Sequence, residues 1–110
     1  MITDLSDHDK RQLKRMYLRL DYFYNRKIQI RKLIDDLNAL VGNLENISKE
    51  WIDKFISYWA ELEIVYSNAL YETKSSFNEQ DSQRIEESLK NLNSLLYSLI
   101  PKEQLEDIKL

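Results

Sequence analysis

The 110-residue chain contains no cysteine, one glycine, one proline and one histidine. The absence of cysteine excludes disulfides and thiolate metal sites, and it is compatible with a reducing compartment. So little glycine and proline leaves few of the residues that β-hairpins need at their turns, which disfavours β structure. No apolar run is long enough to span a membrane, and the N-terminal residues lack the apolar segment of a secretory signal. We therefore expect a cytoplasmic protein.

Enzyme chemistry has few candidate groups in this sequence. The single histidine, His8, lies near the N-terminus, and we interpret it as a solvated residue rather than a catalytic base or metal ligand. No Glu-x-x-His motif, glycine-rich phosphate loop or paired nucleophile and base is present. Glu61 and Glu63 lie about 200° apart on a helix, so they do not converge on one site. We expect no enzymatic activity, no cofactor and no bound metal.

What the sequence does contain is 43% hydrophobic and 32% charged residues, which is typical of one globular domain over residues 1–110. Between residues 13 and 44, apolar residues recur at the a and d positions of a heptad, and only Lys27 interrupts them. The stripe consists of Leu13, Met16, Leu20, Phe23, Lys27, Ile30, Ile34, Leu37, Val41 and Leu44. This pattern predicts one long helix over residues 7–44 that begins after Ser6, and a bend near Asn25 to Lys27 is the alternative.

Two further helices and a short fourth one follow from capping residues. Ser48 is a suitable N-cap for a helix over residues 49–73, and Asn78 for a helix over residues 79–100. Pro101 ends that helix and can begin a short helix over residues 102–108. The predicted fold class is all-α, an antiparallel three-helix bundle with a long first helix and a possible short C-terminal fourth helix.

Residues 50–72 hold both tryptophans and three of the seven tyrosines, and the aromatic stripe of this segment is interpreted as core. The expected stripe is Ile52, Phe55, Trp59, Leu62, Tyr66 and Ala69, flanked by Trp51 and Leu70. Ala60, Ile64, Asn68 and Tyr71 lie on the opposite face of the same helix. Either another helix or the C-terminal tail covers this face, or it binds a partner. The candidate partner-binding residues are Asp53, Glu61, Ile64, Tyr71 and Glu72, with Asp35 and Asp36 as a second choice.

The charges are distributed unevenly along the chain. Residues 1–34 carry nine basic and four acidic side chains, a net charge of +5, whereas residues 35–110 carry seven basic and fifteen acidic ones, a net charge of −8. Oppositely charged helices that lie side by side would partly neutralise each other; the alternative is an acidic partner-binding surface or a basic arm for nucleic acid. Direct nucleic-acid binding is not expected, because the bases of residues 10–32 recur on several helix faces and the whole chain is acidic.

Three segments together resemble a known family: IDDLNALVGNLE (residues 34–45), EWIDKFISYWAELEIVYSNALYE (residues 50–72) and SLKNLNSLLYSL (residues 88–99). The pattern is carried by Asp36, Leu37, Ala39, Leu40, Leu44, Glu45, Trp51, Phe55, Trp59, Leu62, Glu63, Tyr66, Ala69 and Leu70. It resembles the small all-α bacterial immunity proteins of polymorphic-toxin and contact-dependent growth inhibition systems. The resemblance covers roughly residues 33–99 and excludes residues 1–27.

The resemblance implies that the protein binds and neutralises one cognate toxin, often a nuclease, inside the producing cell. A basic nuclease domain would meet the acidic surface of residues 35–110. Two alternatives remain open from the residues themselves. One is a structural module that self-associates through the Leu13–Leu44 stripe with the outward Leu18 and Tyr22, and the other is a nucleic-acid-binding regulator that uses residues 10–32.

Overall fold

The computed structural model describes residues 5–71 and 77–110, apart from the side chains of residues 70 and 71. The described residues form no strand and five helices: α1 (Asp7–Tyr24), α2 (Ile30–Gly42), α3 (Lys49–Tyr71), α4 (Glu79–Leu99) and α5 (Lys102–Asp107). The predicted all-α class is confirmed. None of these helices is both long and apolar enough to cross a membrane.

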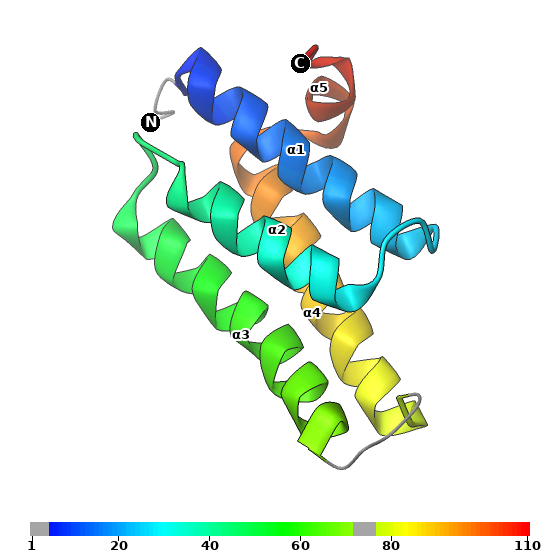
Figure 1. Ribbon diagram of the computed structural model, residues 1–110. Helices are drawn as coiled ribbons and strands as arrows, with labels where there is room; N and C mark the ends of the chain where they lie inside the picture. The colour runs from blue at the N-terminus through cyan, green and yellow to red at the C-terminus, as the bar shows by residue number, and fades with distance from the viewer. Residues whose placement is uncertain (1–4, 72–76) are drawn as a thin grey trace.

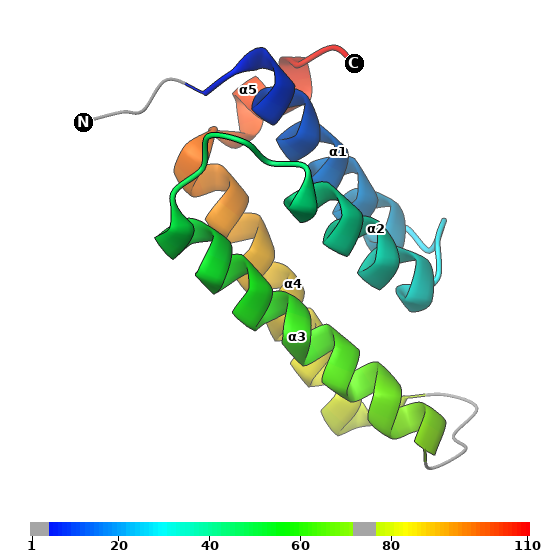
Figure 2. The same ribbon diagram turned by 60° about the vertical axis from the view of Figure 1, so that its left-hand side comes forward.

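The four long helices are arranged as two antiparallel hairpins, α1–α2 and α3–α4 (Figures 1 and 2). Helix α1 packs against α2 and α4, and α3 packs against α2 and α4, so the four helices form a closed ring. Helix α5 turns back and packs against α1. The α3–α4 hairpin is longer than the α1–α2 hairpin and extends beyond it at the lower end of Figure 2.

The prediction of one long first helix is wrong, and with it the three-helix count. The chain leaves the helical conformation after Tyr24 and resumes it at Ile30, so that residues 7–44 form two helices that pack side by side. The alternative, a break near Asn25 to Lys27, has the correct position. The reversal lets the two halves of the apolar stripe pack against each other as well as against α3 and α4.

The reversal depends on a left-handed residue at the end of α1. Arg26 has a φ of 60° and is the one described non-glycine residue with a positive φ. The Arg26 N–H donates to the Phe23 carbonyl (3.0 Å) and the Lys27 N–H to the Tyr22 carbonyl (2.7 Å). These two bonds make a Schellman motif, which normally has an apolar contact between its closing residue and the helix. Here the Lys27 ammonium lies 5.9 Å from the centroid of the Tyr22 ring instead.

The predicted caps are confirmed at the starts of α1, α3 and α4. In each case a side-chain oxygen accepts the backbone N–H three residues on. The pairs are Ser6 with Asp9 (3.0 Å), Ser48 with Trp51 (3.2 Å) and Asn78 with Asp81 (2.7 Å). Asp81 also accepts the Asn78 N–H, which completes a capping box. Helix α5 begins directly after Pro101, as predicted.

A buried carboxylate fixes the loop between α2 and α3. Asp9, in the first turn of α1, is fully buried. Its two oxygens accept the backbone N–H groups of Glu45 (2.9 Å) and Asn46 (2.8 Å). The neighbouring His8 Nε2 lies 2.7 Å from the Asn43 carbonyl oxygen. The beginning of α1 therefore holds the connection between the two hairpins.

A buried ammonium fixes the other end of the chain. The Lys14 side chain donates to the carbonyls of Leu105 (2.8 Å) and Glu106 (2.9 Å) at the end of α5. A cation is favoured at this position because the last carbonyls of a helix have no intrahelical donor. Leu105 is itself fully buried. Helix α5 is thus attached to α1 by one apolar and two polar contacts.

The Arg26 conformation yields a stability prediction. Replacing Arg26 with glycine should raise the free energy of unfolding by about 0.5–1 kcal/mol, since glycine adopts positive φ without strain. Urea denaturation followed by circular dichroism measures the change. The matched control is Asn43→Gly, because Asn43 ends α2 with a φ of −93° and glycine gains nothing there. Equal or opposite effects of the two variants would contradict the role of Arg26.

The Asp9 contacts yield a second prediction. Asp9→Asn should lower the free energy of unfolding by about 2–3 kcal/mol, because the amide group of this buried side chain leaves one of the two loop N–H groups without its acceptor. Asp7→Asn is the control: it removes a carboxylate from the same helical turn, but from an exposed side chain, and should cost less than about 1 kcal/mol. Thermal and urea denaturation measure the free energy of unfolding of both variants. Equal decreases for the two variants would show that the hydrogen bonds of Asp9 to the loop are not the cause.

Candidate partner-binding surface

The inner face of α3 carries its aromatic residues into the core. Trp51 and Phe55 are buried and stacked, with their ring centroids 5.5 Å apart. The Trp51 indole N–H donates to the Leu95 carbonyl of α4 (3.0 Å), so its polar atom is satisfied inside the bundle. Leu62 and Ala69 are buried on the same face. The prediction that these residues form core rather than a binding box is confirmed for the four of them.

The buried face of α3 is rotated towards α4 relative to the predicted stripe. Val65, which the prediction omitted, is buried, whereas Trp59 and Tyr66 are only partly buried. Trp59 lies at the α2 edge of this face, where its indole N–H donates to the Ile34 carbonyl (2.9 Å). Helix α3 therefore packs between α2 and α4.

The opposite face of α3 exposes apolar side chains in a line. Ile56, Ala60 and Ile64 are spaced four residues apart, so they follow one another along one side of the helix over about 12 Å. Ile56 and Ile64 are 38% and 46% exposed, and Ala60 is partly buried between them. We call these three residues the α3 outer row. No described helix covers it, so the alternative in which α4 or the C-terminal tail buries Ile64 does not hold for the described residues.

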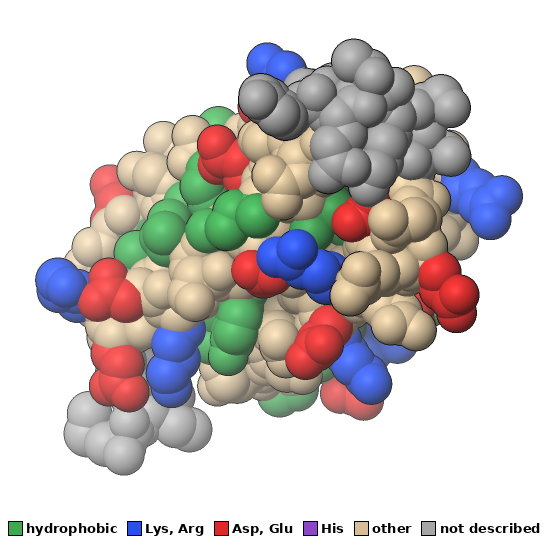
Figure 3. Space-filling view, turned by 90° about the horizontal axis from the view of Figure 1, so that it is seen from below, with side chains coloured by type: hydrophobic (Ala, Val, Ile, Leu, Met, Phe, Trp, Pro, Cys, Tyr) green, Lys and Arg blue, Asp and Glu red, His purple; other side chains and the backbone are tan. Residues whose placement is uncertain are grey.

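Figure 3 looks at the molecule from the lower side of Figure 1 and shows a stripe of exposed hydrophobic side chains with charged side chains next to it. Ile56 and Ile64 are two of the four large hydrophobic side chains that are most exposed among the described residues. A row of this kind offers a flat apolar strip on a rigid helix, which suits contact with another protein.

Carboxylates border the α3 outer row, and two of them have partners. Asp53 accepts from the Lys49 ammonium (2.9 Å), and this hydrogen bond raises the pKa of Lys49. Glu61 accepts from the Arg84 guanidinium of α4 (3.1 Å). Glu63 is exposed, and none of the described residues pairs with it. Of the described acids near the row, Glu63 is thus the one whose charge is not compensated.

The second-choice residues, Asp35 and Asp36, differ in their environment. Asp36 is mostly buried and accepts from Arg19 of α1 (2.8 Å) and from Lys32 (3.1 Å). It links α1 to α2, so its role is structural. Asp35 is exposed and pairs with Arg31 one turn before it (3.2 Å). An exposed pair of this type contributes little to stability and is available to a partner.

Asp35 and Glu63 lie on the same shallow hollow between α2 and α3. Its volume is about 330 Å³, and its lining includes Arg31, Trp59 and Tyr66. The Tyr66 hydroxyl and the Asp35 carboxylate both raise the pKa of Arg31. The structure thus brings one of the second-choice acids next to the α3 surface, a proximity that the sequence did not indicate.

Two candidates, the Tyr71 side chain and Glu72, lie outside the described residues. Two others were missed: Ile56 and Glu63. Ile56 had a signal in the sequence, because it lies two helical turns before Ile64 and four residues before Ala60. Glu63 had none, since a surface carboxylate that lacks a partner is recognised only from the positions of its neighbours.

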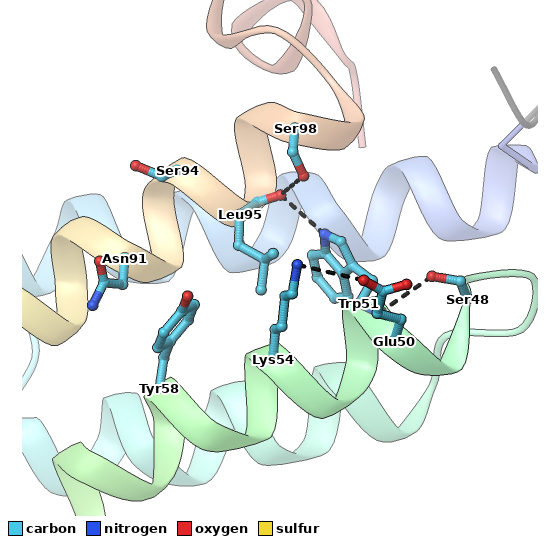
Figure 4. A pocket seen from close by; sticks show the side chains of 9 residues that line it. All are labelled: Ser48, Glu50, Trp51, Lys54, Tyr58, Asn91, Ser94, Leu95 and Ser98. Carbon is cyan, nitrogen blue, oxygen red and sulfur yellow. Dashed lines mark hydrogen bonds and ion pairs between the residues drawn. The ribbon is translucent and has the colours of Figure 1, made fainter. Parts of the chain in front are cut away.

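A polar pocket of about 360 Å³ lies between the beginning of α3 and the end of α4 (Figure 4). Nine residues line it: Ser48, Glu50, Trp51, Lys54, Tyr58, Asn91, Ser94, Leu95 and Ser98. Its one carboxylate, Glu50, pairs with Lys54 (3.6 Å), and the Ser98 hydroxyl donates to the Leu95 carbonyl (2.6 Å). None of the hydroxyl groups in this lining forms a hydrogen bond with Glu50 or Lys54, so no nucleophile paired with a base is formed here.

One group of potential metal ligands occurs in the described part of the chain. Ligand atoms of His8, Asp9 and Glu45 lie within 4.8 Å of one another. Both Asp9 oxygens already accept backbone N–H groups, and the first turn of α1 disfavours a cation through its dipole. The His8 and Asp9 side chains hold the α2–α3 loop, as described above.

Comparison of the chain with protein-family models, with curated sequences and with solved structures finds no match.

The exposure of the α3 outer row predicts that its isoleucines do not stabilise the fold. The double variant Ile56→Gln/Ile64→Gln should change the free energy of unfolding by less than about 1 kcal/mol, because both side chains are accessible and glutamine is a good helix former. Phe55→Ala, on the inner face of the same helix, should cost about 3–5 kcal/mol. Urea denaturation of both proteins provides the comparison. A loss above about 2 kcal/mol for the double variant would show that the row is packed.

Proposed function

We propose that this protein is an immunity protein that binds a cognate bacterial toxin, a basic nuclease domain, and blocks it by stoichiometric association in the producing cell. The resemblance of residues 33–99 to the all-α immunity proteins supports the proposal. Most residues of that pattern, including Trp51, Phe55 and Leu62, lie in the core. The pattern is therefore an argument about the fold, and the argument about binding must come from the surface.

The observation that carries the proposal is the α3 outer row. Ile56 and Ile64 are exposed apolar side chains on a rigid 23-residue helix, with the uncompensated Glu63 beside them and Asp53 one turn before Ile56. Apolar anchors bordered by charge are typical of protein-binding surfaces, because the anchors supply affinity while the charges select the partner. The shallow hollow with Asp35 extends this surface towards α2.

The charge of the surface favours a basic partner. Residues 35–110, which include α3 to α5 and most of α2, have a net charge of −8. A nuclease domain carries a basic face for its nucleic-acid substrate. Attraction between the two would accelerate their encounter, and a partner seated on that face would exclude the substrate. Inhibition by occlusion requires no catalytic residue in this chain.

Self-association through the Leu13–Leu44 stripe is disfavoured by the fold. Leu13, Met16, Leu20, Ile34 and Leu37 of that stripe are all buried in the core of the chain itself. No seam is left for a second copy, because the reversal at Arg26 pairs the two halves of the stripe. A partner must therefore bind elsewhere, and the α3 outer row is accessible.

The test begins with the neighbouring reading frame: where it encodes a secreted protein, the C-terminal domain of that protein is co-expressed with this chain. The domain should arrest growth alone and lose toxicity with this chain, and the two should form a 1:1 complex by calorimetry. Ile56→Lys/Ile64→Lys should raise the dissociation constant of the complex at least about 100-fold and restore toxicity, because two apolar anchors are lost.

The matched control is Gln80→Lys/Gln104→Lys, which adds the same charge at exposed positions of α4 and α5 and should leave binding unchanged. The proposal is wrong if the neighbouring domain remains toxic in the presence of the wild-type chain. If protection is intact in both double variants, the toxin binds the chain but not on the α3 outer row.

A further inference from the structure

A third hollow lies between the α1–α2 turn and the first half of α4 (Figure 1). Its volume is about 680 Å³, roughly twice that of either hollow described above. Concave sites of roughly 300–1,000 Å³ are the size that small-molecule ligands occupy. No residue of α3 belongs to its lining, so this hollow, which we call the turn hollow, is separate from the α3 outer row.

The turn hollow has an apolar lining that is rich in aromatic rings. Ile85 and Leu89 lie one turn apart on α4, and both are buried. Three rings join them in the lining: Phe23, Tyr24 and Phe77. The first and last are partly buried, whereas Tyr24 is 70% exposed and therefore accessible to a ligand. Aromatic rings pack favourably against other rings, so this lining suits a flat apolar ligand.

The charged residues of the lining have opposite signs on its two sides. Arg26 and Lys27 belong to the turn, and Glu86 belongs to α4. The Lys27 ammonium contacts the Tyr22 ring, as described above. Arg26 and Glu86 are exposed, and neither forms a side-chain hydrogen bond or ion pair with any described residue. An anionic group is therefore favoured on the side of the turn and disfavoured on the side of α4.

The backbone of Arg26 provides an independent observation that its side chain has a use outside the fold. Its φ of 60° is a conformation that glycine adopts without strain and that a residue with a Cβ adopts at a cost. The guanidinium has no partner among the described residues that would offset this cost. Strained residues of this kind are concentrated at ligand-binding sites. Arginine at this position is thus explained by a ligand that its guanidinium contacts.

We propose that the turn hollow binds a small aromatic acid, a flat ring system with one carboxylate or sulfonate group. The ring system would pack against the aromatic lining, and its anionic group would accept hydrogen bonds from Arg26, on the side away from Glu86. A neutral apolar molecule would fill the same volume but would leave the guanidinium without a partner. The proposal is independent of the proposed function, because the toxin is placed on α3.

Two fluorescent probes with the same ring system test the proposal on the intact chain. Anilinonaphthalenesulfonate carries an anionic group, and N-phenylnaphthylamine is its neutral counterpart. The fluorescence of the sulfonate rises when it binds an accessible apolar site. The sulfonate should bind at one site per chain and at least about fivefold more tightly than the neutral probe, because a charge-assisted hydrogen bond is added. Naphthoate, a carboxylate of the proposed class, should displace it.

Three variants of the lining separate the contributions. Arg26→Gly should lower the affinity for the sulfonate at least about fivefold, leave the neutral probe unaffected and still raise the free energy of unfolding, as predicted above. Glu86→Gln should raise the affinity for the sulfonate about twofold, since a repulsive charge is removed. Ser82 is exposed in the lining, and Ser82→Trp should abolish binding of both probes by filling the hollow.

The matched control for charge is Arg11→Gln, at an exposed position outside the lining, which should retain the wild-type affinity for the sulfonate. Equal losses in Arg11→Gln and Arg26→Gly would overturn the proposal, since only overall charge would matter. A loss in Ile56→Gln/Ile64→Gln would also overturn it, because the probe would then occupy the α3 outer row. Equal affinities for the two probes would assign the hollow to a neutral apolar ligand instead, and absence of binding would leave it without a ligand of this class. Circular dichroism melting of each variant confirms that the fold is intact.

Discussion

The fold depends on the reversal of the chain at Arg26. Because this residue adopts the left-handed conformation, α1 ends in a Schellman motif and α2 returns along it. The two halves of the first apolar stripe then bury each other, and the resulting hairpin closes a ring with α3 and α4. Asp9 and Lys14 attach the α2–α3 loop and α5 to that hairpin through backbone groups. Without the reversal the Asp9 contacts could not form, because the loop after α2 would lie at the far end of a single helix.

The sequence predicted which residues are buried better than how the chain connects them. Leu13, Met16, Leu20, Ile34 and Leu37 are core residues both in a long helix and in a hairpin, so their periodicity does not distinguish the two. A turn of this kind usually has a glycine at its left-handed position, which makes it recognisable in a sequence. Here the left-handed residue is Arg26. The caps at Ser6, Ser48 and Asn78, in contrast, were predictable, because the cap depends on a local side chain and not on tertiary packing.

The candidate surface was predictable in part, for a similar reason. Ile64 and Asp53 were assigned to the outer side of the helix from angular position alone, which is a local property. The stripe centre was misplaced because α3 packs on two neighbours, and only the structure shows that Val65 faces inwards while Trp59 lies at the α2 edge. Charges were the least predictable feature. Asp36 is paired because the hairpin brings Arg19 of α1 next to it, whereas no described residue pairs with Glu63.

The same reversal also separates charge in space. Pairing of α1 with α2 places Arg19 next to Asp36, where the two side chains form an ion pair. The arginines on the outer side of α1 have no such partner among the described residues. On the other hairpin, Lys49 and Arg84 compensate Asp53 and Glu61, which leaves Glu63 beside the α3 outer row. Pairing within the chain thus compensates several charges and leaves the unpaired arginines of α1 and the unpaired Glu63 of α3. The chain has a net charge of −3, so the pairing within it, rather than the total, decides which charges a partner meets.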